Sequence, residues 1–302
     1  MNNVMDHHKE LRKSGCRAVC EACRLYLFIA LSIVFGTLSL WGQPTPIGLG
    51  SRIIKRAVPI DTLLYDVTYQ MEVETVPGQS EWMITDEVLL QIGKNATKSF
   101  SIALAQVDSV ATVLYKSGAR TVPMYQGLAQ VEVIYRMNCK DQLLVDVRDL
   151  SGDASLYYSE VTPKLKWKMG HETKDILGYS CRSARVDFRG RCYTAWYAPD
   201  IPLSYGPWKF AGLPGLILDI RDDTGEVHYT ATGFRKAQEG EMIMQSIVSS
   251  RSSTREKCNA ALKYMFAHPA QYSKATSGIV LSHGDTILGE SHYCPYNPIE
   301  LE

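Results

Sequence analysis

Strict alternation of apolar and polar residues over residues 63–73 is the feature that most constrains the fold of this chain. The segment LLYDVTYQMEV has apolar or aromatic side chains at every second position from 63 to 73, and Asp, Thr, Gln and Glu stand between them at 66, 68, 70 and 72. Successive side chains of a strand point to opposite faces of its sheet. The pattern therefore predicts a long antiparallel strand with one face buried and the other in water.

Further segments with strand character follow one another at a spacing of roughly ten residues. Turn residues such as Pro77-Gly78 and Arg189-Gly190 separate them and predict hairpins. No internal repeat accompanies the spacing, which argues against a propeller or a solenoid. The expected strands are residues 81–92, 99–104, 130–136, 142–147, 155–161, 165–171, 179–188, 192–197, 216–221 and 227–235.

Residues 253–268 form the clearest expected helix, with Ser253 or Thr254 as the N-cap and an amphipathic pattern behind it. A shorter helix over residues 108–116, capped by Asp108, is the second expectation. About ten strands and one good helix predict a mainly β (α+β) fold. We expect a curved antiparallel sheet, an open or half barrel, although alternation alone does not exclude a sandwich.

An uncharged apolar segment at residues 25–41 follows a basic region and is followed by Gly42, which is the layout of a secretory signal. We expect a signal peptide over residues 1–42, a flexible linker over residues 43–58 and a single domain over residues 59–302. The alternative is that the segment is retained as a membrane anchor. Export would place the protein in the periplasm or cell envelope, or outside the cell.

Five cysteines follow the signal region, and an odd number leaves at least one thiol free. Cys181 and Cys192 lie on the two arms of an expected hairpin in which residue 192 faces about residue 187, so we expect no bond between them. The pairing of the set stays open; its members are Cys139, Cys181, Cys192, Cys258 and Cys294.

Charge and motifs exclude several functional classes. Lys and Arg total 32, as do Asp and Glu, so nothing in the charge favours a nucleic-acid partner. The chain has no GxSxG, HExxH or GxxxxGK[ST] motif. Acidic residues at 219, 222, 223 and 226 are interpreted as a hairpin turn, because Arg221 breaks the calcium-loop order. His171 with Glu172 and Asp175 is interpreted as a polar turn between strands, the alternative being an acid/base or metal-ligand pair. We expect no cofactor and no metal.

The stretch GPWKFAGLPGLILDI, residues 206–220, joins a loop fixed by glycine and proline to a buried strand. The expected loop residues are Gly206, Pro207, Gly212, Leu213, Pro214 and Gly215. Aromatic and basic residues gather around it; these are Trp196, Tyr197, Trp208, Phe210, Arg189, Arg191 and Lys209. They form the best candidate ligand site, in which the basic groups would hold a carboxylate or phosphate. Alternatively, the aromatic residues fix the loop to the core.

The run GLPGLI, together with GPWKF and the upstream FRGR and AWYAPDIP, resembles the signature of the GLPGLI family of exported Bacteroidetes proteins. The tail CPYNPIELE is also similar to how members of this family end. The resemblance implies an exported protein and supplies no molecular function.

Two functional hypotheses follow. The first is non-catalytic binding of an apolar, lipid or peptide ligand, or of an envelope partner protein, by the sheet and the central loop. The alternative is a secreted hydrolase built on polar residues near the loop, which requires them to converge on one point. These residues are His171, Asp200, Asp219 and His228.

Overall fold

The long strand β2 (Arg56–Glu74) lies near the middle of the sheet that positions every candidate residue. A computed structural model describes residues 48–126, 130–149, 155–277, 282–283, 286–287 and 296–302. The expected signal peptide and Cys294 lie outside these residues. The other strands are β1 (Gly48–Leu49), β3 (Met83–Gly93), β4 (Ala96–Ser101), β5 (Tyr125–Gln126), β6 (Glu132–Met137), β7 (Gln142–Arg148), β8 (Ser155–Val161), β9 (Lys168–Ile176), β10 (Tyr179–Phe188), β11 (Arg191–Ala198), β12 (Leu216–Asp222), β13 (Val227–Lys236), β14 (Met242–Ile247), β15 (Ser250–Ser252), β16 (Ser282–His283) and β17 (Thr286–Ile287).

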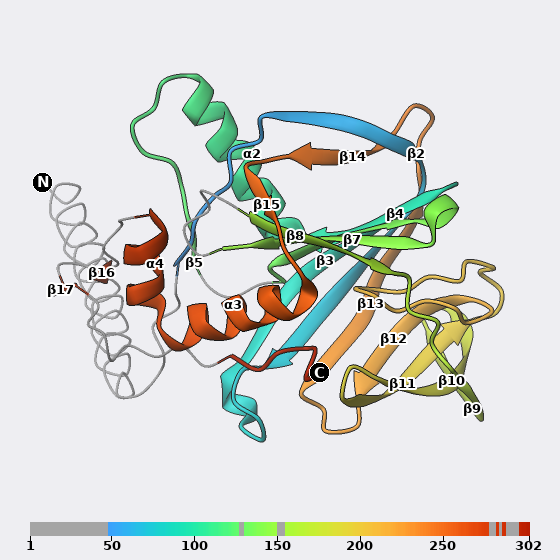
Figure 1. Cartoon of the computed structure of the whole chain (residues 1–302). Coiled ribbons are helices and arrows are strands. Elements are labelled where there is room, and N and C mark those ends of the chain that lie inside the picture. The colour runs from blue at the N-terminus through green and yellow to red at the C-terminus, as the bar shows by residue number, and fades with distance from the viewer. Residues whose placement is uncertain (1–47, 127–129, 150–154, 278–281, 284–285, 288–295) are drawn as a thin grey trace, which may run out of the picture. The chain divides into compact units, whose positions relative to one another are not determined.

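The main sheet has 13 strands in the order β15-β8-β7-β6-β4-β3-β2-β13-β12-β11-β10-β9, with β14 also paired to β2. Its strand pairs are antiparallel except that of β15 with β8. The sheet is open rather than closed into a barrel (Figure 1). The prediction of a mainly β fold with a large antiparallel sheet is confirmed, while the strand number is larger than predicted.

The helices are α2 (Ile102–Lys116), α3 (Arg255–Ala267) and α4 (Pro269–Ser277). The prediction of α3 is confirmed, with Thr254 as its N-cap: the Thr254 hydroxyl accepts a hydrogen bond from the backbone of Lys257. Its apolar side is buried. In Figure 1, α3 lies alongside the sheet, and the C-terminal end of the chain lies close to it.

Helix α2 begins earlier than predicted, so the prediction of Asp108 as its cap is wrong. Ser101 is the N-cap, because its hydroxyl accepts a hydrogen bond from the backbone of Leu104. The apolar residues after Ser101 suggested a longer strand, but they form the first turn of the helix. Asp108 consequently lies inside α2, where only 2% of its surface is exposed.

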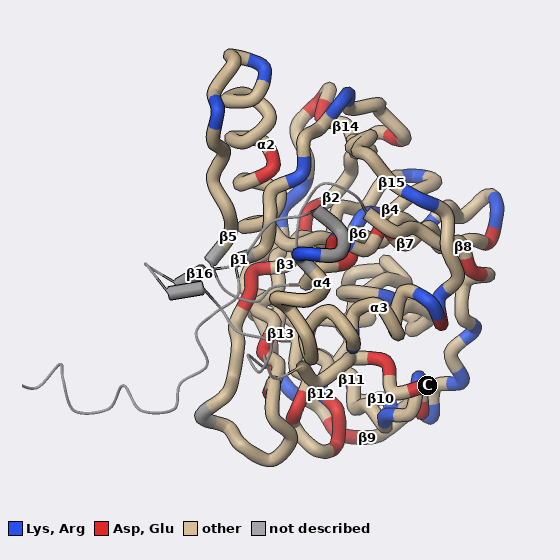
Figure 2. The backbone as a smooth tube through the Cα atoms, turned by 60° about the vertical axis from the view of Figure 1, so that its left-hand side comes forward, with Lys and Arg blue, Asp and Glu red and all other residues tan. Residues whose placement is uncertain are grey.

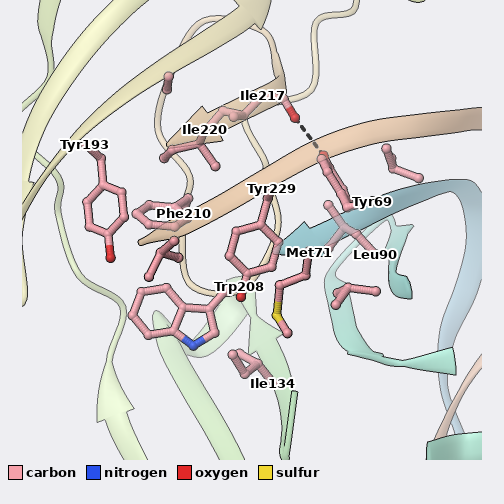
Figure 3. Packing of buried hydrophobic residues seen from close by; sticks show 14 of the residues in the cluster. Tyr69, Met71, Leu90, Ile134, Tyr193, Trp208, Phe210, Ile217, Ile220 and Tyr229 are labelled. Atoms are coloured by element: carbon pink, nitrogen blue, oxygen red, sulfur yellow. Dashed lines mark hydrogen bonds between the residues drawn. The ribbon is translucent and has the colours of Figure 1, made fainter. Parts of the chain in front are cut away.

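The alternation in β2 forms the centre of the core. Of its alternating apolar side chains, those at 63, 67, 69, 71 and 73 are buried as predicted, and Tyr65 is partly buried. On the face predicted to lie in water, Asp66 is buried. The hydroxyl of Tyr69 donates a hydrogen bond of 2.7 Å to the backbone oxygen of Ile217 on β12, which satisfies a buried polar group (Figure 3). Met71 and Tyr229 pack beside it in the same cluster. The long strand thus joins the two halves of the sheet through one apolar layer.

Residues 48–58, which we expected to belong to a flexible linker, include buried side chains. Leu49 is fully buried, and Arg52 is 6% exposed and contacts Asp108 and Asp146. The packed part of the chain therefore begins before residue 59.

The cysteines of the described residues are unpaired: Cys181 and Cys258 are buried, Cys192 is partly buried and Cys139 is exposed. The hairpin of β10 and β11 places Asp187 opposite Cys192, as the sequence predicts. Cys181 and Cys192 are accordingly not bonded to each other.

Candidate functional site

The glycine- and proline-rich loop connects β11 to β12 and is largely buried. A Cβ atom on Gly215 would lie 2.3 Å from the backbone oxygen of Ala198, so only glycine fits there. Gly212 has φ +95°, in the region that favours glycine. The indole of Trp167 donates a 2.9 Å hydrogen bond to the backbone oxygen of Ala211. The loop thus has one shape, held by close packing.

Three of the predicted aromatic residues lie in the core. Tyr197, Trp208 and Phe210 are 2%, 3% and 1% exposed. The rings of Trp208 and Phe210 lie 5.3 Å apart, and Phe210 meets Tyr193 edge to face at 4.8 Å (Figure 3). This packing corresponds to the second interpretation of the motif, in which aromatic residues fix the loop to the core.

Trp196 lies on the opposite face of the sheet from Tyr197, because neighbouring residues of a strand point to opposite faces. It pairs across strands with Asp219, and the ammonium of Lys174 lies 5.8 Å from its ring centre. The expected aromatic wall is therefore divided between two faces and does not form one surface.

The basic residue at the centre of the motif, Lys209, is 1% exposed and surrounded by acidic groups. Its Nζ lies 2.8 Å from a carboxylate oxygen of Glu160 and donates hydrogen bonds to the carboxylate of Glu300 and, at 2.8 Å, to the hydroxyl of Tyr158. The backbone oxygen of Lys209 accepts a 3.0 Å bond from Arg136. The carboxylates that Lys209 contacts belong to the chain itself, whereas the sequence predicted that it would hold a carboxylate or phosphate of a ligand.

Arg191 is also buried and contacts the C-terminal end of the chain. Its guanidinium donates hydrogen bonds to the side chain of Asn297 at 2.7 Å and to the backbone oxygen of Pro298 at 2.9 Å. The same group pairs with Asp222 at 2.7 Å and Glu226 at 2.8 Å. Arg191 therefore ties β11 both to the β12–β13 turn and to the end of the chain.

Arg189 occupies the tight turn between β10 and β11. Its backbone oxygen accepts a 2.9 Å bond from the nitrogen of Leu301, and its guanidinium lies 2.6 Å from Glu160. Gly190 follows with φ +79°, and a Cβ atom there would lie 2.8 Å from Leu301. The turn is shaped to lie against the end of the chain.

We call residues 296–302 the tail segment. The residues that form hydrogen bonds or ion pairs with it are called the tail groove. The groove includes Arg189, Arg191, Tyr193, Lys209 and Arg255. Figure 2 shows basic and acidic positions close together around the C-terminal end. No pattern in the sequence indicated that Glu160, Arg255 and Glu300 would belong to the site. The residues at 294–302 contributed only to the family resemblance.

Glu300 is the acidic anchor of the tail segment. Arg255 on α3 donates a 3.1 Å hydrogen bond to its carboxylate, and Asn259 donates another at 3.3 Å. Burial alone would raise the pKa of Glu300, but Lys209 and Arg255 outweigh burial and lower this pKa below its ordinary value. The contact is therefore strongest when Glu300 is ionised, and protonation of Glu300 in acid weakens it.

A small apolar cavity of about 50 Å³ lies beneath the tail segment, between β2, β6 and α3. Its lining includes Met71, Val73, Glu132, Phe266 and Tyr296. The rings of Phe266 and Tyr296 are stacked 4.4 Å apart. Burial raises the pKa of Glu132 to about 7, although Lys209 acts in the opposite direction.

Replacing Glu132 with glutamine is expected to stabilise the protein above pH 7. The folded-state pKa is raised from 4.5 to about 7, so between these pH values the folded chain keeps a proton that the unfolded chain releases. Stability therefore falls between pH 4.5 and about 7, and the full loss applies above pH 7. We expect the variant to be more stable than the parent at pH 8 by up to about 3 kcal/mol and equally stable at pH 4.5. Urea unfolding at both pH values measures this. Glu87→Gln, at an exposed position of β3, is the matched control; a variant less stable at pH 8 contradicts the prediction.

Two of the four residues suggested for a hydrolase meet on the polar face of the sheet. His228 Nε2 lies 3.2 Å from Asp219 and 2.9 Å from the hydroxyl of Thr230. His171 lies on β9, separated from β12 by β11 and β10, and Asp200 lies in the turn after β11. The hydrolase hypothesis requires all four residues to converge, and the contacts of the described residues join His228 and Asp219 of the four. The part of the chain that the structure describes contains no group of three or more His, Cys, Asp or Glu residues able to hold a metal.

Comparison with known proteins gives one family match. The family described as "Protein of unknown function (Porph_ging)" matches residues 189–219, which run from the β10–β11 turn through the loop into β12. This stretch contains all three basic residues, at 189, 191 and 209, that were predicted as ligand groups. The match therefore covers a large part of the tail groove.

No curated protein matches the chain. Two solved structures of PNGF-II are similar to it. The one in space group P21 has 19% sequence identity and a TM-score of 0.43, covering 65% of this chain and 32% of that one. The one in space group C2 has 17% identity and the same TM-score, covering 66% and 32%. The chain thus spans about a third of the length of these structures. Among the described residues, no helix is long and apolar enough to span a membrane.

Proposed function

We propose that this protein binds an extended acidic peptide without catalysis, and that its own tail segment occupies the peptide site. In this proposal the ligand is a segment of an envelope partner that exchanges with the tail segment. The observation that carries it is the contact of Lys209 and Arg255 with Glu300: two cations in the groove hold one carboxylate of the tail.

The remaining contacts are those by which proteins hold extended peptides. Arg191 binds the backbone oxygen of Pro298, and Leu301 donates its backbone N–H to Arg189. Backbone contacts of this kind contribute affinity, while side-chain pockets contribute specificity. Here the specific positions are Asn297 and Glu300, which are 6% and 8% exposed.

Size favours a peptide over a lipid. The apolar cavity beneath the tail segment has about 50 Å³, whereas pockets for small molecules usually have about 300–1,000 Å³. Met71, Phe266 and Tyr296 already fill the space around it. A lipid chain would have to displace these side chains. A peptide that replaces the tail segment can instead form the same contacts with the groove.

The test releases the tail segment after folding. Residues 288–294 of the full chain are replaced by a protease recognition sequence, and the folded protein is cut there. We expect native mass spectrometry to show the cut segment still bound, and a labelled peptide of residues 296–302 to exchange with it. Since a hydrogen bond to a charged group contributes about 1.5–3 kcal/mol, a peptide with Glu300→Gln is expected to bind at least about tenfold more weakly.

A peptide with Glu302→Gln is the matched control, because Glu302 is exposed, and it is expected to bind like the parent peptide. Equal binding of the Glu300→Gln peptide would contradict the proposal. So would a cut segment that leaves without rebinding at millimolar concentration. Loss of the fold on cutting, followed by circular dichroism, would also contradict it, because the segment would then be part of the core and not a ligand.

We also propose that the chain belongs to the GLPGLI family and is exported through a signal peptide cut after Gly42. The family match at residues 189–219 supports the first point, since it covers most of the motif region. The basic and apolar pattern before Gly42 supports the second. Amino-terminal sequencing of the protein from its host is expected to begin at Gln43, whereas Met1 would contradict export by cleavage.

A further inference from the structure

A second cavity, of about 220 Å³, lies between α2, β4, β6 and the segment before β2. It shares no lining residue with the tail groove. Its charged lining residues are Arg52, Lys98, Asp108 and Arg148. Its apolar and aromatic walls include Ile54, Phe100, Leu104, Val131, Val133 and Tyr135. The site therefore combines an apolar enclosure with a few charged groups, as small-molecule sites do.

Two of the three cations are matched by carboxylates. Arg52 pairs with Asp108 and with Asp146, both at 3.1 Å, and Arg148 pairs with Asp108 at 2.6 Å. Arg148 also donates a 2.6 Å bond to the backbone oxygen of Gly50. Its Nε, in a side chain that is 1% exposed, has no hydrogen-bond partner within the described residues. This cluster of ion pairs forms one end of the cavity. Within the described residues, the Nε–H of Arg148 is left there without an acceptor.

The third cation, Lys98, has no carboxylate within ion-pair distance among the described residues. It is 9% exposed, and its Nζ donates one hydrogen bond of 2.9 Å, to the backbone oxygen of Met244. The aromatic rings of Phe100 and Tyr135 lie 4.3 Å and 5.8 Å from it. A buried ammonium without an opposite charge is unfavourable. An anion in the cavity would provide that charge.

We propose that this cavity binds a small monocarboxylate with a compact apolar body, which places its carboxylate on Lys98. The size of the cavity limits that body: a cavity of about 150 Å³ holds benzene, so 220 Å³ admits a single ring or a short branched chain with its carboxylate. Rings and branches of this kind would contact Phe100, Leu104 and Val133. The proposal is independent of the tail groove.

Binding is expected to depend on pH in two steps. Burial, assisted by Arg52, lowers the pKa of Lys98 to about 8, so Lys98 loses its charge above that pH. Burial also raises the pKa of Asp86 to about 6; its carboxylate accepts bonds from Ser101 and Gln130 in the cavity wall and adds negative charge above pH 6.

The other charged and titratable groups facing Lys98 do not account for a change in binding near pH 8. Arg52 on the segment before β2 and Arg148 on β7 stay charged below pH 9, and burial raises the pKa of Tyr135 on β6 to about 12. Asp108 on α2 is paired with both arginines. The step near pH 8 therefore reports on Lys98.

The test is calorimetric titration of the full chain with benzoate. We expect a Kd below about 1 mM at pH 7 and about tenfold weaker binding at pH 9, as Lys98 loses its proton. Benzyl alcohol, which is uncharged, and inorganic phosphate, which lacks the apolar body, are each expected to bind at least about tenfold more weakly. Lys98→Met, which removes the ammonium and keeps an unbranched apolar side chain, is expected to weaken benzoate binding at least tenfold and to remove the step near pH 8.

Lys94→Met is the matched control, because Lys94 lies exposed in the turn between β3 and β4; it is expected to leave binding unchanged. Equal benzoate binding by Lys98→Met would overturn the proposal, as would no benzoate binding at 10 mM ligand or tighter binding of phosphate than of benzoate. If Lys98→Met does not fold, the pH dependence of benzoate binding by the parent chain is the test. Unchanged benzoate affinity between pH 7 and pH 9 then overturns the proposal.

Discussion

Replacing Lys209 with methionine is expected to lower the free energy of unfolding by about 3–5 kcal/mol. The substitution leaves Glu160 and Glu300 facing each other without the cation between them, and it removes a hydrogen bond to Tyr158. The destabilisation comes from the loss of the cation that the two buried carboxylates share, although Arg189 still contacts Glu160 and Arg255 still contacts Glu300. Methionine fills most of the same volume, so packing contributes little. Chemical unfolding at pH 7, followed by circular dichroism, measures it.

Lys164→Met is the control for this prediction, since the side chain of Lys164 is 88% exposed and its ion pair with Asp141 is 4.0 Å long. Exposed pairs contribute about 0–1 kcal/mol. If Lys209→Met and Lys164→Met change the stability equally, Lys209 does not hold buried carboxylates as described.

Replacing Asp108 with alanine is the second large effect, with an expected loss of about 3–5 kcal/mol. Its carboxylate accepts hydrogen bonds from the backbone and side chain of Arg52 and from Arg148. Without it, two buried guanidinium groups lose their shared partner. The segment before β2 is therefore expected to separate from α2, which amide hydrogen exchange at residues 50–54 would detect.

Asp223→Ala provides the matched control, because the ion pair of Asp223 with Arg185 is about half exposed on both sides. We expect a change below about 1 kcal/mol. Unchanged protection of residues 50–54 in Asp108→Ala would show that Asp108 does not anchor this segment.

Local patterns predicted the parts of the fold that depend on neighbouring residues. The alternation of β2, the pairing of Asp187 with Cys192 and the amphipathic α3 are all present. Each depends on side-chain period or turn chemistry within a few residues. Helix α2 was misplaced because the apolar residues after Ser101 fit either a strand or a helix, and only the sheet around them decides which.

The candidate site could be predicted only in part. The residue types of the motif indicated a site for the carboxylate or phosphate of a ligand, whereas the carboxylates that Lys209 contacts are those of Glu160 and Glu300. Its partner Glu300 lies 91 residues away in the sequence, and no local pattern connects the two. The strand period placed Trp196 and Tyr197 on opposite faces, which could have excluded a common aromatic wall beforehand.

The contact between the motif and the tail segment is the central claim, and a double-mutant cycle of Lys209→Met with Glu300→Gln tests it most directly. The free energy of unfolding of the parent, both single variants and the double variant gives the coupling between the two side chains. We predict a coupling of at least about 1.5 kcal/mol at pH 7, because Lys209 and Glu300 form a direct charged contact that is nearly excluded from water. A coupling below about 0.5 kcal/mol would contradict the claim that Lys209 holds the tail through Glu300.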